Sequence, residues 1–324
     1  MLEITFNTHT YPIPEKWEEL SPEQFIYLVD LLRGYSRGEI SAESVRALFF
    51  LEAAGIKPQR IRLKEQTDRF SENVFRIARQ LNFMFRIEYE NKKAISAFPA
   101  GVLTLLHRFL PEEIDDESAE IRAARKLKKQ RVIDAVFGIN LIPEIPIRRK
   151  VLKGYRFDLT GNIIQMDLKA GQFIDACTVY DQFSETSDSV YLDMITGILY
   201  GNEPVELIRK VPDATKAAVL FNFQANLLFL QENTDYSVLW WNEPTKSKKK
   251  TSSRLGFSDS LYTIAKAGYG DLQNLKDLPV LDFLNLLIKE LRDAVLALKE
   301  SKKNNAEIAE ATKLTLAQVN FLAQ

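Results

Sequence analysis

The segment Gln24–Leu32 reads QFIYLVDLL, and it decides the fold because the chain uses the same kind of segment twice. Phe25 is followed by apolar residues three, four and seven positions later, the spacing of one face of an α-helix. Gln172-Phe173-Ile174 begins a second segment with the same spacing, 148 residues further on. These features predict a mainly α-helical protein with an internal duplication.

Further matches follow these two segments in the same order. They are Gly55 with Gly201, Pro58 with Pro204, Gln80 with Gln224, and Asn82 with Asn226. The offset falls slowly from 148 to 144, as small deletions in loops would cause. The alternative is that any helical protein contains similar amphipathic segments, but chance matches would scatter the offset. We therefore expect two related helical domains.

Each copy is expected to open with a short β-hairpin and continue with helices. Apolar and polar residues alternate over 2–14 and over 155–166, around turn residues. Ser21 and Gln24 form a capping box, whereas Lys169 replaces the serine in the second copy. A second helix should end near the matched glycine. The third helix should carry Val74, Ile77, Leu81, Met84 and Phe85 in one copy, and Ala218, Phe221, Ala225, Leu228 and Phe229 in the other.

The sequence divides into five predicted segments. They are a helical repeat domain with its hairpin (1–110), a charged helix with an extended proline-containing connector (111–152), a second repeat domain (153–241), a Lys/Ser-rich loop or linker (242–256), and a C-terminal helical module with a tail (257–324). Residues 217–230 should form a buried helix, since three polar residues interrupt this apolar run and it is too short to span a bilayer.

The charged connector has two readings. Acidic residues over 112–120 precede basic residues over 122–131, an order that suits a solvated helix with its macrodipole. A basic strip for phosphates or an acidic partner is the alternative. The segment Leu141–Ile147 should be extended, because each of its prolines disfavours helix in the preceding residue. It could dock on a neighbour, but we expect it to lie along its own second domain.

Two features of the C-terminal third concern binding. The polar segment 245–254 carries five cations, which indicates a solvated loop rather than a phosphate-binding site, because no aromatic residue is interleaved for base stacking. A leucine-rich helix follows Pro279 and needs an opposing surface from its own chain or from a partner. Its candidate partner-binding residues are Leu284, Leu287, Leu291 and Val295.

The last residues resemble a helix-turn-helix only weakly. Residues 306–310 and 315–319 have suitable apolar positions, but Lys313 stands where the turn favours glycine, and the second helix has no Arg or Lys for DNA. A DNA-associated helical regulatory protein, using this tail or the basic connector, is therefore the alternative function.

The residues give no signature of catalysis. The 324 residues carry 43 Lys and Arg against 44 Asp and Glu, so no overall field attracts nucleic acid or an anionic membrane. Cys177 is the single cysteine and should fill the core, and neither His9 nor His107 has a second ligand at metal spacing. We expect no enzyme activity, cofactor, metal or small-molecule substrate. The amino terminus has no signal-peptide pattern, so we expect a cytoplasmic protein.

Three segments carry a family resemblance: DLKAGQFID at 167–175, ILY at 198–200, and LYTIAKAGYGD at 261–271 with the leucine-rich helix after it. They are similar to uncharacterised phage and prophage proteins that are encoded among tail genes, often near the tape-measure gene. The resemblance covers about a third of the chain. It implies a tail-assembly chaperone or scaffold located in the bacterial host cell or in the virion, whose partners are other tail proteins.

Overall fold

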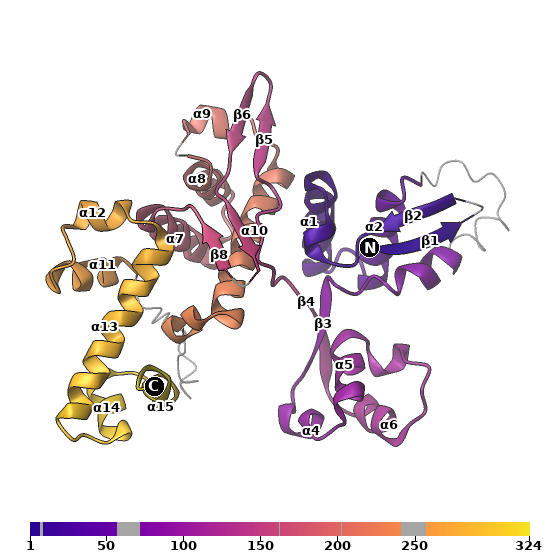
Figure 1. Ribbon diagram of the computed structural model, residues 1–324. Coiled ribbons are helices and arrows are strands. Elements are labelled where there is room, and N and C mark those ends of the chain that lie inside the picture. The colour runs from indigo at the N-terminus through magenta and orange to yellow at the C-terminus, as the bar shows by residue number, and fades with distance from the viewer. Residues whose placement is uncertain (7–8, 57–71, 162, 202, 241–256) are drawn as a thin grey trace. The chain divides into compact units, whose positions relative to one another are not determined.

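The computed structural model describes residues 1–6, 9–56, 72–161, 163–201, 203–240 and 257–324. These residues form two compact units, called here unit 1 (Met1–Val136) and unit 2 (Phe137–Gln324). The described part is mainly helical, and its strands form two-stranded antiparallel pairs (Figure 1). The prediction of a mainly helical fold with short hairpins is confirmed.

Unit 1 begins with the expected hairpin and two capped helices. Its first elements are β1 (Leu2–Phe6), β2 (His9–Ile13), η1 (Trp17–Glu19), α1 (Pro22–Ser36) and α2 (Ala42–Ala53). The Ser21 hydroxyl accepts a hydrogen bond from the Gln24 amide at 3.2 Å, and the Gln24 side chain accepts one from the Ser21 amide at 3.0 Å. This predicted capping box satisfies two amides that would otherwise need partners at the helix start.

The third helix of unit 1 ends earlier than predicted. Residues 72–78 are helical, and the chain then turns into β3 (Phe85–Tyr89), which pairs with β4 (Lys129–Ile133). Phe85, Ile87 and Tyr89 alternate along β3 and are buried. Buried side chains therefore recur every two residues, as in a strand, and the prediction that the helix continues to Phe85 is wrong.

The charged connector is not one long helix, so that prediction is also wrong. Its acidic part contains η3 (Pro111–Glu113) and α6 (Ala119–Arg125), whereas its basic end is β4. Pairing with β3 supplies the backbone partners that a helix would have provided. These elements, with α4 (Lys92–Ser96) and α5 (Ala100–Arg108), surround a small core that includes Leu106 and Ile121.

Unit 2 contains two hairpins and a group of packed helices. Its elements up to residue 240 are β5 (Glu144–Ile147), β6 (Lys150–Lys153), β7 (Phe157–Thr160), β8 (Ile163–Met166), α7 (Ala170–Thr186), α8 (Val190–Leu199), α9 (Val205–Ile208), α10 (Asp213–Asn233) and η4 (Asp235–Trp240). The hairpin expected over 155–166 is confirmed as β7–β8. Most of α10 is buried, as predicted.

A buried polar network attaches the segment before β5 to α10. The Asn226 side chain donates to the carbonyl oxygens of Phe137 and Ile139 at 3.0 and 2.9 Å, and it accepts a hydrogen bond from the Tyr155 hydroxyl at 2.6 Å. The Asn222 side chain accepts one from the Leu141 amide at 2.9 Å. Because the network and the buried side chains of this segment belong to unit 2, the expectation that it lies along its own domain is confirmed.

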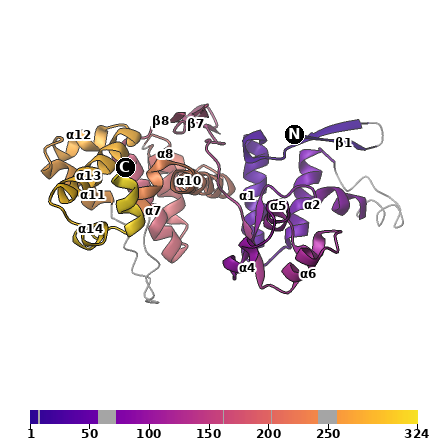
Figure 2. The same ribbon diagram turned by 60° about the horizontal axis from the view of Figure 1, so that its bottom comes forward.

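The C-terminal helices belong to unit 2. They are α11 (Phe257–Lys266), α12 (Leu272–Asp277), α13 (Val280–Glu300), α14 (Asn305–Thr312) and α15 (Leu316–Leu322) (Figures 1 and 2). The starts of α7 and α13 are joined by backbone hydrogen bonds, from the Ala170 amide to Leu278 at 2.8 Å and from the Val280 amide to Leu168 at 2.9 Å. The chain turns after α11, where Gly268 and Gly270 have positive φ.

Two predictions fall on residues that the structure does not describe. They concern Pro58 and the Lys/Ser-rich segment 242–256. Among the helices that it does describe, none combines the length and apolar character needed to cross a bilayer.

Candidate functional site

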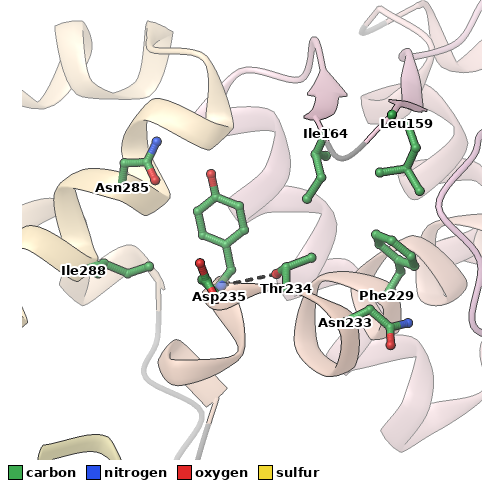
Figure 3. A pocket seen from close by; sticks show the side chains of 10 residues that line it. Leu159, Ile164, Phe229, Asn233, Thr234, Asp235, Asn285 and Ile288 are labelled. Atoms are coloured by element: carbon green, nitrogen blue, oxygen red, sulfur yellow. Dashed lines mark hydrogen bonds between the residues drawn. The ribbon is translucent and has the colours of Figure 1, made fainter. Parts of the chain in front are cut away.

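A groove on unit 2 is the candidate functional site, and we call it the hairpin groove. Its volume is about 460 Å³, and three parts of the chain line it: the β7–β8 hairpin, the corner between α10 and η4, and one side of α13 (Figure 3). Leu159, Ile164, Phe229 and Ile288 supply its apolar surface, and Asn233, Asp235, Tyr236 and Asn285 supply its polar groups.

The first wall is one face of the β7–β8 hairpin, and part of the same face is buried in the core of unit 2. Phe157 lies opposite Met166, and Leu159 lies opposite Ile164, so side chains two residues apart share one face. Phe157 and Met166 are buried, whereas Leu159 is 42% exposed. The hairpin therefore carries apolar surface from the core out to the groove.

The second wall is the corner where α10 ends. The Thr234 hydroxyl donates to the Leu230 carbonyl at 2.6 Å and accepts a hydrogen bond from the Tyr236 amide at 3.2 Å (Figure 3). Thr234 itself has an extended backbone, which ends the helix. These contacts place Asp235 and Tyr236 at the groove, next to Phe229, whose ring packs edge-on against Phe157 at 6.1 Å.

The third wall is a side of α13 on which Asp282, Asn285 and Ile288 follow each other at three-residue spacing. Burial raises the pKa of Tyr236, a hydrogen bond with Asn285 lowers it, and the carboxylates of Asp282 and Asp235 raise it further. Both carboxylates are thus close enough to act on Tyr236. Both are exposed, so the rim of the groove is negatively charged.

The arrangement of these side chains is suited to binding. Within the described residues, no three His, Cys, Asp or Glu side chains lie together as metal ligands would. Cys177 is buried on α7, as expected, and His107 is exposed at the end of α5. The groove combines apolar surface with carboxylates, amides and a phenol, which are the groups that orient a bound protein segment.

The predicted partner-binding stripe on α13 lies beside the groove and not in it. Leu284 and Val295 are fully buried, Leu287 is 9% exposed, and Leu291 is half-buried. Elements α7, α11, α14, α15 and η4 of the same unit contact α13. The chain itself therefore supplies the opposing surface that the stripe needs, and a partner role for these four residues stays a prediction.

Sequence patterns indicate only some of the groove residues. Asn285 and Ile288 lie next to the stripe on the same helix, where its apolar face borders its polar one. The other walls come from residues 159–164 and 229–236, which no periodicity relates to α13. Their proximity to α13 depends on the tertiary packing of unit 2.

Cations of the basic connector are used within unit 1. Arg46 is 1% exposed, and its guanidinium pairs with Glu113 at 2.9 Å. Arg131 also pairs with Glu113, and it pairs with Glu43 at 2.9 Å. This cluster ties α2 to η3 and β4. Arg131 of the connector is therefore paired within unit 1, whereas the alternative function, a DNA-associated regulator, would need such cations to contact phosphate.

Unit 1 also contains a hollow of about 620 Å³, lined by charged residues of both signs. Two of them, Arg86 and Asp134, form an ion pair in which Nη1 and Oδ1 are 3.5 Å apart. Because this hollow mixes charges that can pair with each other, it gives a less definite binding preference than the hairpin groove.

Comparison with known proteins gives no further evidence for the function of this chain. No family model, no curated protein and no solved structure matches this chain. A functional proposal therefore depends on the geometry of the hairpin groove and on the sequence resemblance.

Proposed function

We propose that this protein is a non-enzymatic phage tail-assembly or tail-structural protein that binds other tail proteins through its helical grooves and amphipathic faces. The observation that supports binding is the hairpin groove, where an apolar floor is open to solvent and is bordered by amides and carboxylates. Grooves of this kind accept segments of other proteins. The assignment to phage tails, and with it a location in the bacterial host cell or in the virion, follows from the sequence resemblance.

An internal duplication is part of the same proposal, and the starts of α1 and α7 support it. The Gln172 side chain accepts a hydrogen bond from the Lys169 amide at 3.2 Å, as Gln24 does from Ser21. Phe25 and Phe173 are both fully buried at matched positions. A helical cap bond and its adjacent core residue thus occur in both copies.

The ends of the next helices give further support. Gly55 follows α2 and Gly201 follows α8, and both have positive φ, 63° and 88°. The copies differ after this point, since the helix that includes residues 72–78 ends at residue 78 in unit 1, whereas α10 extends to Asn233. A duplicated unit whose third helix ends at different points in the two copies accounts for both observations.

Co-purification tests the proposed function. The tagged full chain would be produced together with the proteins encoded by the neighbouring tail genes and isolated under native conditions. We expect at least one tail protein to be retained, and we expect Asn285→Arg, which places a long cation in the groove, to reduce its recovery. Asp175→Arg, an exposed site on α7, is the control. A chain that retains no tail protein would contradict the proposal.

A DNA-associated regulator is the second candidate, and one observation favours it. Helices α14 and α15 contact each other and are joined by only three residues, as in a helix-turn-helix. However, Lys313 has φ +57° at the turn, and α15 contains no Arg or Lys. This function requires salt-dependent binding to a DNA duplex. The absence of a gel shift at low salt would exclude it.

A further inference from the structure

The β5–β6 hairpin ends in an exposed basic tip. Arg148 and Arg149 form its turn, and neither makes an ion pair with any described residue, whereas Lys150 beside them pairs with Glu203 at 2.6 Å. Val151 follows and is 48% exposed. The tip therefore offers two available guanidinium groups next to an apolar side chain.

The backbone at this tip favours glycine, yet the chain has arginine there. Arg148 has φ +51°, in the left-handed region, which costs a non-glycine residue about 1 kcal/mol. Strain of this kind is often found where a side chain has a role in binding. Among the described residues of unit 2, none forms an ion pair with the Arg148 side chain, so it is available to a complementary surface.

The hairpin groove has the complementary charge. None of its lining residues is Lys or Arg, whereas Asp235 and Asp282 are exposed beside it and form no ion pair within the described ranges. The cation next to Ile288, Lys289, is engaged by the Tyr269 hydroxyl at 2.7 Å and by Asp293 at 3.8 Å. The groove thus combines an apolar floor with two available carboxylates.

We propose that the β5–β6 hairpin tip of one copy of this chain docks in the hairpin groove of a second copy. In this contact Arg148 and Arg149 pair with Asp235 and Asp282, and Val151 meets the apolar floor. Arginine–carboxylate pairs of this kind fix orientation as well as contributing affinity. The negative rim also disfavours nucleic acid as an occupant of the same groove.

The contact joins different surfaces of the two copies. Within unit 2, β5 and β6 project away from α13, so a tip does not reach the groove of its own unit (Figure 1). A contact between unlike surfaces leaves a free tip and a free groove at the ends of each assembly, and it builds chains or rings. The contact is small, so we expect a dissociation constant of about 10 μM or weaker.

This inference rests on the groove as a protein-binding site, which is part of the proposed function, but its test is independent of that function. Self-association is measured on the purified full chain alone, whereas tail-protein capture is measured by co-purification. A chain that captures tail proteins but stays monomeric would overturn the inference and leave the proposed function intact. A chain that self-associates through the groove but captures nothing would do the opposite.

Sedimentation velocity of the full chain is the first test. At low salt the mean mass should rise with concentration, and high salt should weaken this rise because exposed ion pairs are screened. Arg148→Gly combined with Arg149→Ser removes both charges and suits the turn, and it should weaken self-association at least tenfold. Arg209→Glu, at an exposed arginine of the same unit, should leave it unchanged. A wild-type chain that stays monomeric at low salt would overturn the inference.

Charge reversal provides the decisive second test. The pair Arg148→Glu and Arg149→Glu should abolish association, and so should the pair Asp235→Lys and Asp282→Lys. Mixing the two variants should restore association, because the reversed tip of one variant then meets the reversed groove of the other, and the unchanged arginine tip meets the unchanged acidic groove. Circular dichroism of each variant checks that unit 2 is folded. Folded variants that associate alone, or that fail to associate when mixed, would overturn the inference, as would equal loss in the Asp175→Lys control.

Discussion

Replacing Asn226 by leucine tests whether the buried polar network holds unit 2 together. The change keeps the approximate size of the side chain but removes its hydrogen bonds to the Tyr155 hydroxyl and to the carbonyl oxygens of Phe137 and Ile139. Each buried polar group left without a partner costs about 1–3 kcal/mol. The added apolar surface of leucine offsets about 1 kcal/mol. We therefore expect Asn226→Leu to lower the free energy of unfolding by about 4 kcal/mol.

Urea unfolding followed by far-ultraviolet circular dichroism measures this loss. Hydrogen exchange of peptides from α10 shows whether the affected transition belongs to unit 2. Asn233→Leu is the matched control, since Asn233 is an exposed residue at the end of the same helix, and it should change stability by less than about 0.5 kcal/mol. Similar losses for the two variants, or a loss below about 1 kcal/mol for Asn226→Leu, would refute the reasoning.

Three further outcomes follow from local geometry. Burial would raise the pKa of the Glu113 carboxyl, but hydrogen bonds with Arg46, the Leu110 amide and Arg131 lower it. Unit 1 should therefore lose stability as the pH falls below the usual carboxyl pKa, and Glu113→Gln should flatten this dependence in acid titrations followed by tryptophan fluorescence. Lys313→Gly should raise stability by about 0.5–1 kcal/mol in thermal unfolding, because φ is +57° there; a decrease would count against the turn geometry. Gln24→Ala should cost about 0.5–1 kcal/mol in urea unfolding, through the lost cap bond, and no loss would contradict the cap.

The sign of the acid effect follows from the direction of the pKa shift. A carboxyl with a lower pKa in the folded state stabilises the fold above its unfolded pKa, and this stabilisation disappears as the pH falls toward the folded value. Glu43 acts in the same sense. Burial would raise its pKa, but hydrogen bonds to its own backbone amide and to Arg131 lower it to about 2. A stability that stays constant through acid pH would contradict this part of the account.

Local signals in the sequence predicted the elements that depend on neighbouring residues. The β1–β2 and β7–β8 hairpins, the capping box of α1, and the start of α13 after Pro279 all follow from residues within a few positions of each other. Such signals need no knowledge of distant contacts. They account for both of these hairpins and for the starts of α1 and α13.

Long-range pairing explains what the sequence did not show. Strand β3 pairs with β4 across about 40 residues of intervening chain, and its first residue, Phe85, also fits the helical spacing of the apolar residues before it. In the same way, the charge order of the connector predicts a helix at its basic end, where pairing with β3 makes it strand β4. The hairpin groove is a stronger case, because its three walls come from distant segments and only the packing of unit 2 brings them together.

Site-specific photo-crosslinking from the hairpin groove tests whether this groove binds tail proteins. A photoreactive amino acid would replace Asn285 at the groove rim or, as the control, Ile163, which is 67% exposed on the opposite face of the β7–β8 hairpin. In bacteria that express the tail genes, we expect crosslinks to another tail protein from position 285 and few from position 163. Crosslinks from position 163 alone, or none from position 285 while a tail protein co-purifies, would show that binding occurs elsewhere.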